Sequence, residues 1–192
     1  MRLFLAGLVP DVLQAEMYAQ LAAARRAASQ ARWVPSGQLH LTLAFLGEVE
    51  ASRVPTLVSA LQPVALRHSA VQLWLRGAGT FGRPHQPDVL YAKLAGEVEG
   101  LRALEKEVEA ALSPWATEGK PAPFHPHLTL ARARGRQGDA ALSRCVRALR
   151  EQLFGSFRLE QLVLFQSVLG PGGARHTPVV EFPLGSASAA HV

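Results

Sequence analysis

Residues 38–49 read QLHLTLAFLGEV, and residues 124–135 read FHPHLTLARARG, so the tetrapeptide His-Leu-Thr-Leu occurs twice in the chain. Each copy stands in an alternation of apolar and polar residues, which is the pattern of a β-strand with one buried face. An identical tetrapeptide at corresponding places in two stretches of sequence indicates two similar structural units.

Alternate side chains of a strand point to the same face. His40 and Thr42 are therefore predicted to point one way while the neighbouring leucines point the other. His127 and Thr129 repeat this arrangement in the second copy. Each copy is expected to present an imidazole beside a hydroxyl, on a strand that leucines anchor in a core.

Hydrophobic periodicity outside the two copies predicts an alternation of strands and helices. The predicted strands are 2–9, 39–47, 70–79, 88–94, 125–131, 156–165 and 177–183, and the predicted helices are about 11–28, 52–66, 97–115 and 139–152. On the first helix, we expect Val12, Ala15, Tyr18 or Ala19, and Ala22 to face the core. The two units are expected to be lobes of one domain at 1–185, followed by a flexible tail at 186–192.

The composition bounds the class of protein. A chain of 192 residues at 48% hydrophobic can bury a core, and it has no apolar run approaching the ~18 residues of a membrane span. The net charge is +5, carried by 17 arginines and three lysines, and arginine suits phosphate oxygens. The excess of Arg, Ala, Leu and Val also fits a GC-rich genome. The single Cys145 has no disulfide partner, so we expect a small buried hydrophobe and a cytoplasmic location.

Two imidazoles that face one another can act at neutral pH as one general acid and one general base. Hydroxyls beside them can donate hydrogen bonds to phosphoryl oxygens, so the two motifs together would suit cleavage of a bond at phosphorus. Two other interpretations stay open at this point. A histidine on a strand is often structural, and His40, His125 and His127 could together bind zinc.

The quoted motifs also carry a family resemblance. HLTLAFLGEV at 40–49 and HPHLTLARAR at 125–134 resemble the two His-x-Thr-hydrophobic signatures of the 2H phosphoesterase superfamily, and most closely those of the RNA 2′,3′-cyclic phosphodiesterases, also known as 2′-5′ RNA ligases. The similarity includes RLFLAGLVPD at 2–11 and the closing segment at 162–184. It therefore covers nearly the whole chain.

The resemblance implies an α+β fold that is bilobal, with two pseudo-symmetric lobes, each an antiparallel sheet with helices, around a central active-site groove. It also implies hydrolysis of RNA 2′,3′-cyclic phosphate ends to 2′-phosphates, without a metal or nucleotide cofactor. Some members of the family join tRNA halves through a 2′-5′ linkage. The expected partner is thus RNA with cyclic phosphate ends, including tRNA fragments, with no membrane contact and a monomeric protein.

Transferred to this sequence, the resemblance makes His40 the general acid and His127 the general base. Thr42, Thr129 and Arg132 become the phosphate-binding residues. Strand alternation alone would put Arg132 on the leucine side, so its access to the site requires a bend or bulge after Leu130. The alternative from another functional class is a non-catalytic module that binds RNA ends.

This sequence departs from the family pattern near the expected groove walls. Asp88 stands where arginine is common, Tyr91 where tryptophan is common, and His176 in a region that often carries tyrosine. The aromatic residues that could stack on a base, although each also suits a core, are Trp33, Phe45, Trp74, Phe81 and Tyr91. The basic run that could follow flanking phosphates is Arg132, Arg134 and Arg136.

Overall fold

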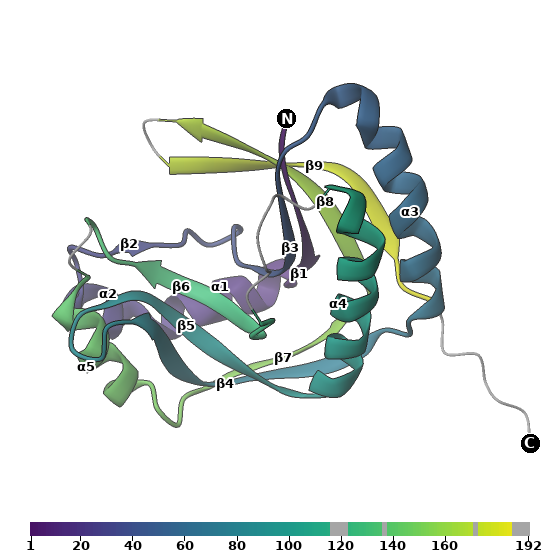
Figure 1. Cartoon of the computed structure of the whole chain (residues 1–192). Helices are drawn as coiled ribbons and strands as arrows, with labels where there is room; N and C mark the ends of the chain where they lie inside the picture. Colours follow the sequence, from purple (N-terminus) through teal and green to yellow (C-terminus); the bar gives the residue numbers. More distant parts are fainter. Residues whose placement is uncertain (116–122, 136–137, 171–172, 186–192) are drawn as a thin grey trace, which may run out of the picture.

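The computed structural model of the protein describes residues 1–115, 123–135, 138–170 and 173–185. The fold has two antiparallel sheets with helices packed on them (Figure 1). The first sheet has the order β3-β1-β8-β9, in which the strands span Arg2–Leu8 (β1), His40–Glu48 (β3), Gln161–Gly170 (β8) and Gly173–Pro183 (β9). The second has the order β2-β6-β5-β4-β7, with bounds Arg32–Trp33 (β2), Val71–Gly82 (β4), Pro87–Gly96 (β5), His127–Arg132 (β6) and Leu153–Leu159 (β7).

The helices of the described residues are Asp11–Gln20 (α1), Ala22–Ala27 (α2), Val54–Arg67 (α3), Val98–Leu112 (α4) and Ala140–Ala148 (α5), with short 3-10 turns at Ala51–Arg53 and Ser113–Trp115. Helices α3 and α4 lie side by side at one edge of the molecule (Figure 1). None of the helices in these ranges is long and apolar enough to cross a membrane.

The α+β class with two antiparallel sheets is confirmed, but the sheets do not follow successive stretches of the chain. Strands β4 and β5 precede the second motif and pair beside it, whereas β8 and β9 return to the first sheet. The predicted single strand at 156–165 is wrong, because the chain passes there from β7 to β8 at Glu160. The apolar alternation runs through this point unbroken, so the sequence pattern hides the change of sheet.

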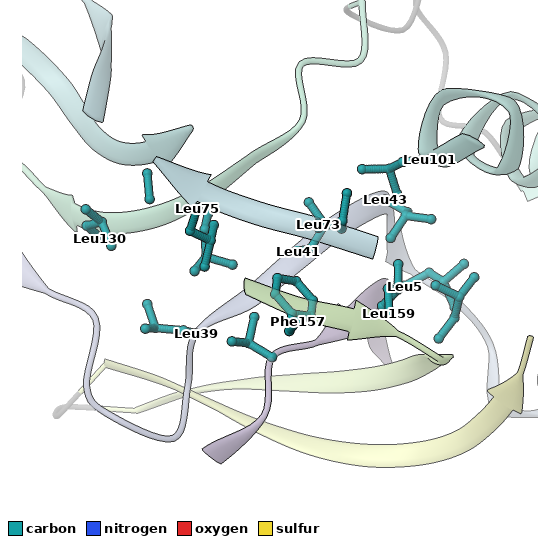
Figure 2. Packing of buried hydrophobic residues seen from close by; sticks show 14 of the residues in the cluster. Leu5, Leu39, Leu41, Leu43, Leu73, Leu75, Leu101, Leu130, Phe157 and Leu159 are labelled. Carbon is teal, nitrogen blue, oxygen red and sulfur yellow. The ribbon is translucent and has the colours of Figure 1, made fainter. Parts of the chain in front are cut away.

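The motif leucines anchor both strands in one core cluster that residues of both sheets share. Leu39, Leu41 and Leu43 of the first motif and Leu128 and Leu130 of the second are at most 5% exposed. Figure 2 shows leucines of both motifs directed into the layer between the sheets. Each such side chain contributes roughly 1.5–3 kcal/mol by its burial. On this basis we propose that residues 1–185 form one domain.

The face predicted for the first helix is wrong. Val12 is 72% exposed, and the stripe that packs on the core comprises Leu13, Met17, Leu21 and Ala24, together with the polar Gln14. Both stripes have helical spacing, and the one with larger apolar side chains is buried because it removes more apolar surface from water. The predicted buried position of Cys145 is confirmed, and residues 186–192, the predicted tail, lie outside the described residues.

Candidate active site

The same hydrogen bond holds both motif histidines. Nδ1 of His40 lies 2.8 Å from the carbonyl oxygen of Gln38, and Nδ1 of His127 lies 2.7 Å from that of His125. In each case the acceptor belongs to the residue two positions earlier. A carbonyl oxygen only accepts, so this bond assigns the proton of each neutral ring to Nδ1. Both Nε2 atoms are left to exchange a proton with a ligand.

Each imidazole also rests on aromatic rings of its own sheet. The ring centroid of His40 lies 5.1 Å from that of Phe4, and the ring of His127 lies 4.9 Å from Phe81 and 5.4 Å from Tyr91. Phe4 and Tyr91 are 3% and 7% exposed. These rings form an apolar floor that fixes the orientation of each imidazole and keeps water from one side of it.

The two threonines lie where strand alternation predicts them. Thr42 and Thr129 are half-buried and follow their histidines by two residues, on the face opposite the buried leucines. Thr42 pairs with Ala6 of β1, and Thr129 pairs with Tyr91 of β5. Each hydroxyl therefore projects from the same face as its imidazole.

A β-bulge interrupts each motif strand at the last leucine of the motif. The pairing of β1 with β3 skips Leu43, and the pairing of β5 with β6 skips Leu130. These leucines hold the same position in their motifs, so the bulge is part of the repeat. Because a bulge adds one residue to its strand, it shifts the alternation of faces by one position.

The bulges bring Phe45 and Arg132 to equivalent positions on the histidine face. Each is the fifth residue after its motif histidine, and each is exposed, Phe45 by 75%. The expectation that a bend or bulge after Leu130 would release Arg132 from the leucine side is confirmed. The first sheet thus presents an aromatic ring where the second presents a guanidinium.

The charges of the two sheets meet around the histidines. Burial lowers the pKa of His40, and the charges of His176, Arg132 and His127 lower it further, against the hydrogen bond to Gln38, which raises it. Burial also lowers the pKa of His127, with the Arg132 charge acting in the same direction. Since Arg132 and His127 affect His40, the two motifs and the guanidinium share one region of space, and strands β3 and β6 are in contact.

A third histidine joins the first sheet's half of the site from β9. The ring of His176 meets that of His40 edge to face at 5.3 Å and that of Phe4 at 4.9 Å. Its Nδ1 is buried without a partner among the described residues, and burial lowers its pKa. His176, noted in the sequence only as a departure from the family pattern, is therefore in contact with a motif histidine.

Tyr91, which also departs from the family pattern, contacts a histidine in the segment that precedes β6. Its hydroxyl lies 3.1 Å from Nε2 of His125, and burial raises its pKa. A cavity of about 180 Å³ adjoins this pair. Its lining is Tyr91, Lys93, Leu94, Val98, Arg102, His125 and Pro126. The Tyr91 hydroxyl therefore holds the His125 ring next to the second motif.

Gln14 supports the first motif from α1, a role that was not expected from the sequence. It is 3% exposed, its Nε2 donates to the Val9 carbonyl at 2.9 Å, and its Oε1 accepts from the Leu39 backbone N–H at 2.8 Å. Leu39 immediately precedes His40. The signal available was spacing, because Gln14 stands three and seven residues before the core positions Met17 and Leu21.

The structure separates the five aromatic candidates for base stacking. Phe81 and Tyr91 stack on each other at 4.4 Å and belong to the floor. Trp33 is half-buried with its indole N–H bonded to the Ala28 carbonyl at 3.0 Å, and Trp74 is 43% exposed on β4. Phe45 is the most exposed of the five candidates and lies on the histidine face, so it offers an open ring beside the first motif.

Two further predictions from the sequence concern a zinc site and the basic run of arginines after the second motif. Within residues 1–115, 123–135, 138–170 and 173–185, no group of three His, Cys, Asp or Glu side chains has a metal-binding arrangement, so His40, His125 and His127 do not converge as a triad there. In the basic run, Arg134 is exposed after β6. Arg136 lies outside the described residues.

Each of the two antiparallel sheets presents a His-x-Thr strand, and these two strands are in contact. The model of the 2′-5′ RNA ligase superfamily matches residues 9–170. An RNA 2′,3′-cyclic phosphodiesterase of Thermus thermophilus is 35% identical over 96% of this chain and 90% of its own. One of Aeropyrum pernix is 31% identical over 77% and 83%.

Solved structures of similar proteins share this fold. TT0787 of Thermus thermophilus superposes with a TM-score of 0.80 at 30% identity, covering 97% of this chain and all of the other. LigT of Escherichia coli complexed with 3′-AMP gives 0.75 at 26% identity, covering 95% and 97%. The chain belongs to the 2′-5′ RNA ligase superfamily. Its family and curated relatives support RNA 2′,3′-cyclic phosphodiesterase activity.

Proposed function

We propose that the protein hydrolyses RNA 2′,3′-cyclic phosphate ends to 2′-phosphates by metal-independent acid–base catalysis with His40 and His127. The observation that carries the proposal is the repeated Nδ1 hydrogen bond, which prepares one Nε2 from each sheet for proton transfer. The matching hydroxyls of Thr42 and Thr129 and the guanidinium of Arg132 supply donors for the phosphate.

The reaction is a displacement at phosphorus in which water enters opposite the leaving oxygen. Nε2 of His127 takes a proton from water while the water oxygen bonds to phosphorus. The bond from phosphorus to O3′ breaks, and Nε2 of protonated His40 gives its proton to O3′. The products are a 2′-phosphate and a free 3′-hydroxyl. When the 5′-hydroxyl of a second RNA takes the place of water, the same step with the same roles gives a 2′-5′ linkage. Cleavage of that linkage back to the cyclic phosphate is the reverse step, in which the two roles are exchanged.

Phosphate binding sets the protonation state that this step needs. Without a ligand, burial and neighbouring positive charge favour the neutral form of both imidazoles, because they lower both pKa values. A phosphodiester anion between the two rings favours one protonated imidazole. The catalytic state, one neutral and one charged ring, is thus formed together with the substrate complex.

We assign the terminal nucleobase to the first sheet. The ring of Phe45 is exposed at the position equivalent to Arg132, and an exposed aromatic ring is a stacking surface for any base. The second sheet then binds most of the phosphate charge, and the first sheet binds the base. Cyclic phosphate ends of tRNA fragments meet these requirements, and one protein molecule contains the complete site.

The test is turnover of a short RNA ending in a 2′,3′-cyclic phosphate, in EDTA, with 2′-phosphate and 3′-phosphate standards. The expected product is the 2′-phosphate alone, and His40→Ala and His127→Ala should each reduce kcat by at least about a hundredfold. Binding that survives with no product from the wild-type protein would favour the RNA-end-binding alternative. Activity lost on chelation and restored by zinc would favour the metal alternative.

The separate roles of the histidines can be distinguished with a substrate whose 3′ bridging oxygen is replaced by sulfur. A thiolate leaves without a proton, so loss of the acid should matter little. We expect His40→Ala to recover most of the wild-type rate on this substrate and His127→Ala to stay inactive. Recovery by His127→Ala instead would exchange the two assignments.

A further inference from the structure

Arg32 lies directly opposite Arg132 in the antiparallel pair of β2 and β6. Both side chains are exposed. Directly opposed residues of such a pair project from the same face with their Cβ atoms about 5 Å apart. Arg32 therefore stands on the histidine face, beside the guanidinium whose charge reaches both motif histidines.

Two hydrogen bonds fix this short strand in place. The indole N–H of Trp33 donates to the Ala28 carbonyl at 3.0 Å, and the backbone N–H of Val34 donates to the carbonyl of the bulge residue Leu130 at 2.9 Å. Trp33 also packs against the core. Arg32 is thus presented by an anchored segment rather than by a free loop.

Like charges directly opposite each other on a sheet are destabilising unless a counter-charge lies between them. In the described parts of the chain, no carboxylate forms an ion pair with Arg32 or Arg132. The nearby carboxyl of Asp88 lies against Gly82 on β4. The pair is therefore arranged for an anion that comes from outside these segments.

Arg32 stands on β2, the edge strand of the second sheet, and is therefore one strand further from His127 than Arg132 is. The charge of Arg132, which is on the same strand as His127, lowers the pKa values of His40 and His127. The second guanidinium is thus one step further from the reacting centre. A cyclic phosphate occupies the 3′ end of an RNA, so the next phosphate lies on the 5′ side of the terminal nucleotide.

We propose that Arg32 binds this next RNA phosphate, adjacent to the one that Arg132 contacts, and that the RNA leaves the site past β2. The inference rests on the proposed function and adds to it a preference for oligonucleotide ends over cyclic mononucleotides. The recognised chemistry is a backbone phosphodiester, which a guanidinium binds through two parallel N–H donors.

The experiment compares a five-nucleotide RNA ending in a 2′,3′-cyclic phosphate with the corresponding nucleoside 2′,3′-cyclic monophosphate that lacks a 5′-phosphate. Arg32→Gln should raise KM for the oligonucleotide roughly tenfold and leave kcat and KM for the mononucleotide unchanged. The dependence of log kcat/KM on log salt for the oligonucleotide should become shallower by about one phosphate contact.

Two neutralising variants serve as matched controls. Lys93 pairs with His127 at the other end of β6, so Lys93→Gln tests an RNA path past the cavity beside His125. Arg158→Gln removes an exposed charge on β7. Both should leave the ratio of oligonucleotide to mononucleotide kcat/KM unchanged.

Each other outcome overturns the subsite. An equal loss on both substrates would place Arg32 on the scissile phosphate, and no loss on either would leave it without a ligand. If the ratio of oligonucleotide to mononucleotide kcat/KM changed in Lys93→Gln but not in Arg32→Gln, the RNA would leave past the cavity beside His125 instead of past β2. Wild-type protein that turns over neither substrate would instead refute the proposed function itself.

Discussion

Replacement of Gln14 by leucine should both destabilise the protein and misplace the first motif. The side chain is almost fully buried and makes two hydrogen bonds, one to the Val9 carbonyl and one from the Leu39 N–H. Leucine has a similar volume, so it fills the space without a cavity while leaving two backbone groups unpaired. At about 1–3 kcal/mol for each unpaired buried group, the free energy of unfolding should fall by roughly 2–6 kcal/mol.

Urea unfolding at neutral pH measures this change, and Gln20→Leu provides the control on the same helix. Gln20 is exposed and its bonds to Phe154 and Gln152 should each matter by less than about 1 kcal/mol. Because Leu39 precedes His40, the Gln14 variant should also lose activity under conditions in which it stays folded. A fall below about 1 kcal/mol, or full activity, would refute the reasoning that this amide holds the motif.

Three other changes probe the site. His176→Phe removes a charge that lowers the pKa of His40, so the basic limb of the kcat/KM profile should move to higher pH, and an unmoved limb would exclude this coupling. Arg132→Lys keeps the charge but loses the paired donors, so kcat/KM should fall about tenfold or more, which steady-state kinetics would measure. Phe45→Ala should raise KM roughly five- to a hundredfold, whereas Phe45→Trp should have a KM close to that of the wild type. Equal KM values for the alanine variant and the wild type would mean that no base stacks on Phe45.

Stability should also fall in acid because of the same histidines. The folded-state pKa values of His40, His127 and His176 lie below their ordinary value, so the unfolded chain binds more protons in that interval. Above the unfolded-state pKa of about 6.5, the three rings are neutral in both states, so their burial carries no protonation penalty. As the pH falls below that value, the unfolded chain takes up protons first and the folded state loses stability. Urea midpoints between pH 8 and 5 should decrease, and a flat profile would contradict the burial of neutral rings.

The repeated motif was sufficient to predict much of the site because it encodes both the strand and its faces. Alternation placed the leucines in the core and the imidazoles and hydroxyls opposite them, as the structure has them. Alternation could not place Phe45 and Arg132, because a one-residue bulge depends on pairing with a neighbouring strand. For Arg132, the family resemblance supplied what the local pattern could not.

Other features depend on contacts between distant segments, which a single sequence does not encode locally. Arg32 and Arg132 become neighbours only when β2 pairs with β6. His176 reaches His40 only because β9 returns to the first sheet. The same return explains why the strand predicted at 156–165 was wrong, since the exchange between sheets leaves no break in the apolar alternation. Tertiary pairing, not propensity, decides these positions.

The central claim is that one histidine from each sheet acts on a single shared phosphate. Titration of ¹⁵N-histidine-labelled protein with a nucleoside 2′-phosphate, the expected product end, tests it most directly, with His40→Ala and His127→Ala used to assign the Nε2 resonances. The account predicts that both Nε2 resonances shift together, along one saturation curve that ends at one nucleotide per protein. A shift of only one resonance, or two curves with different midpoints, would contradict it.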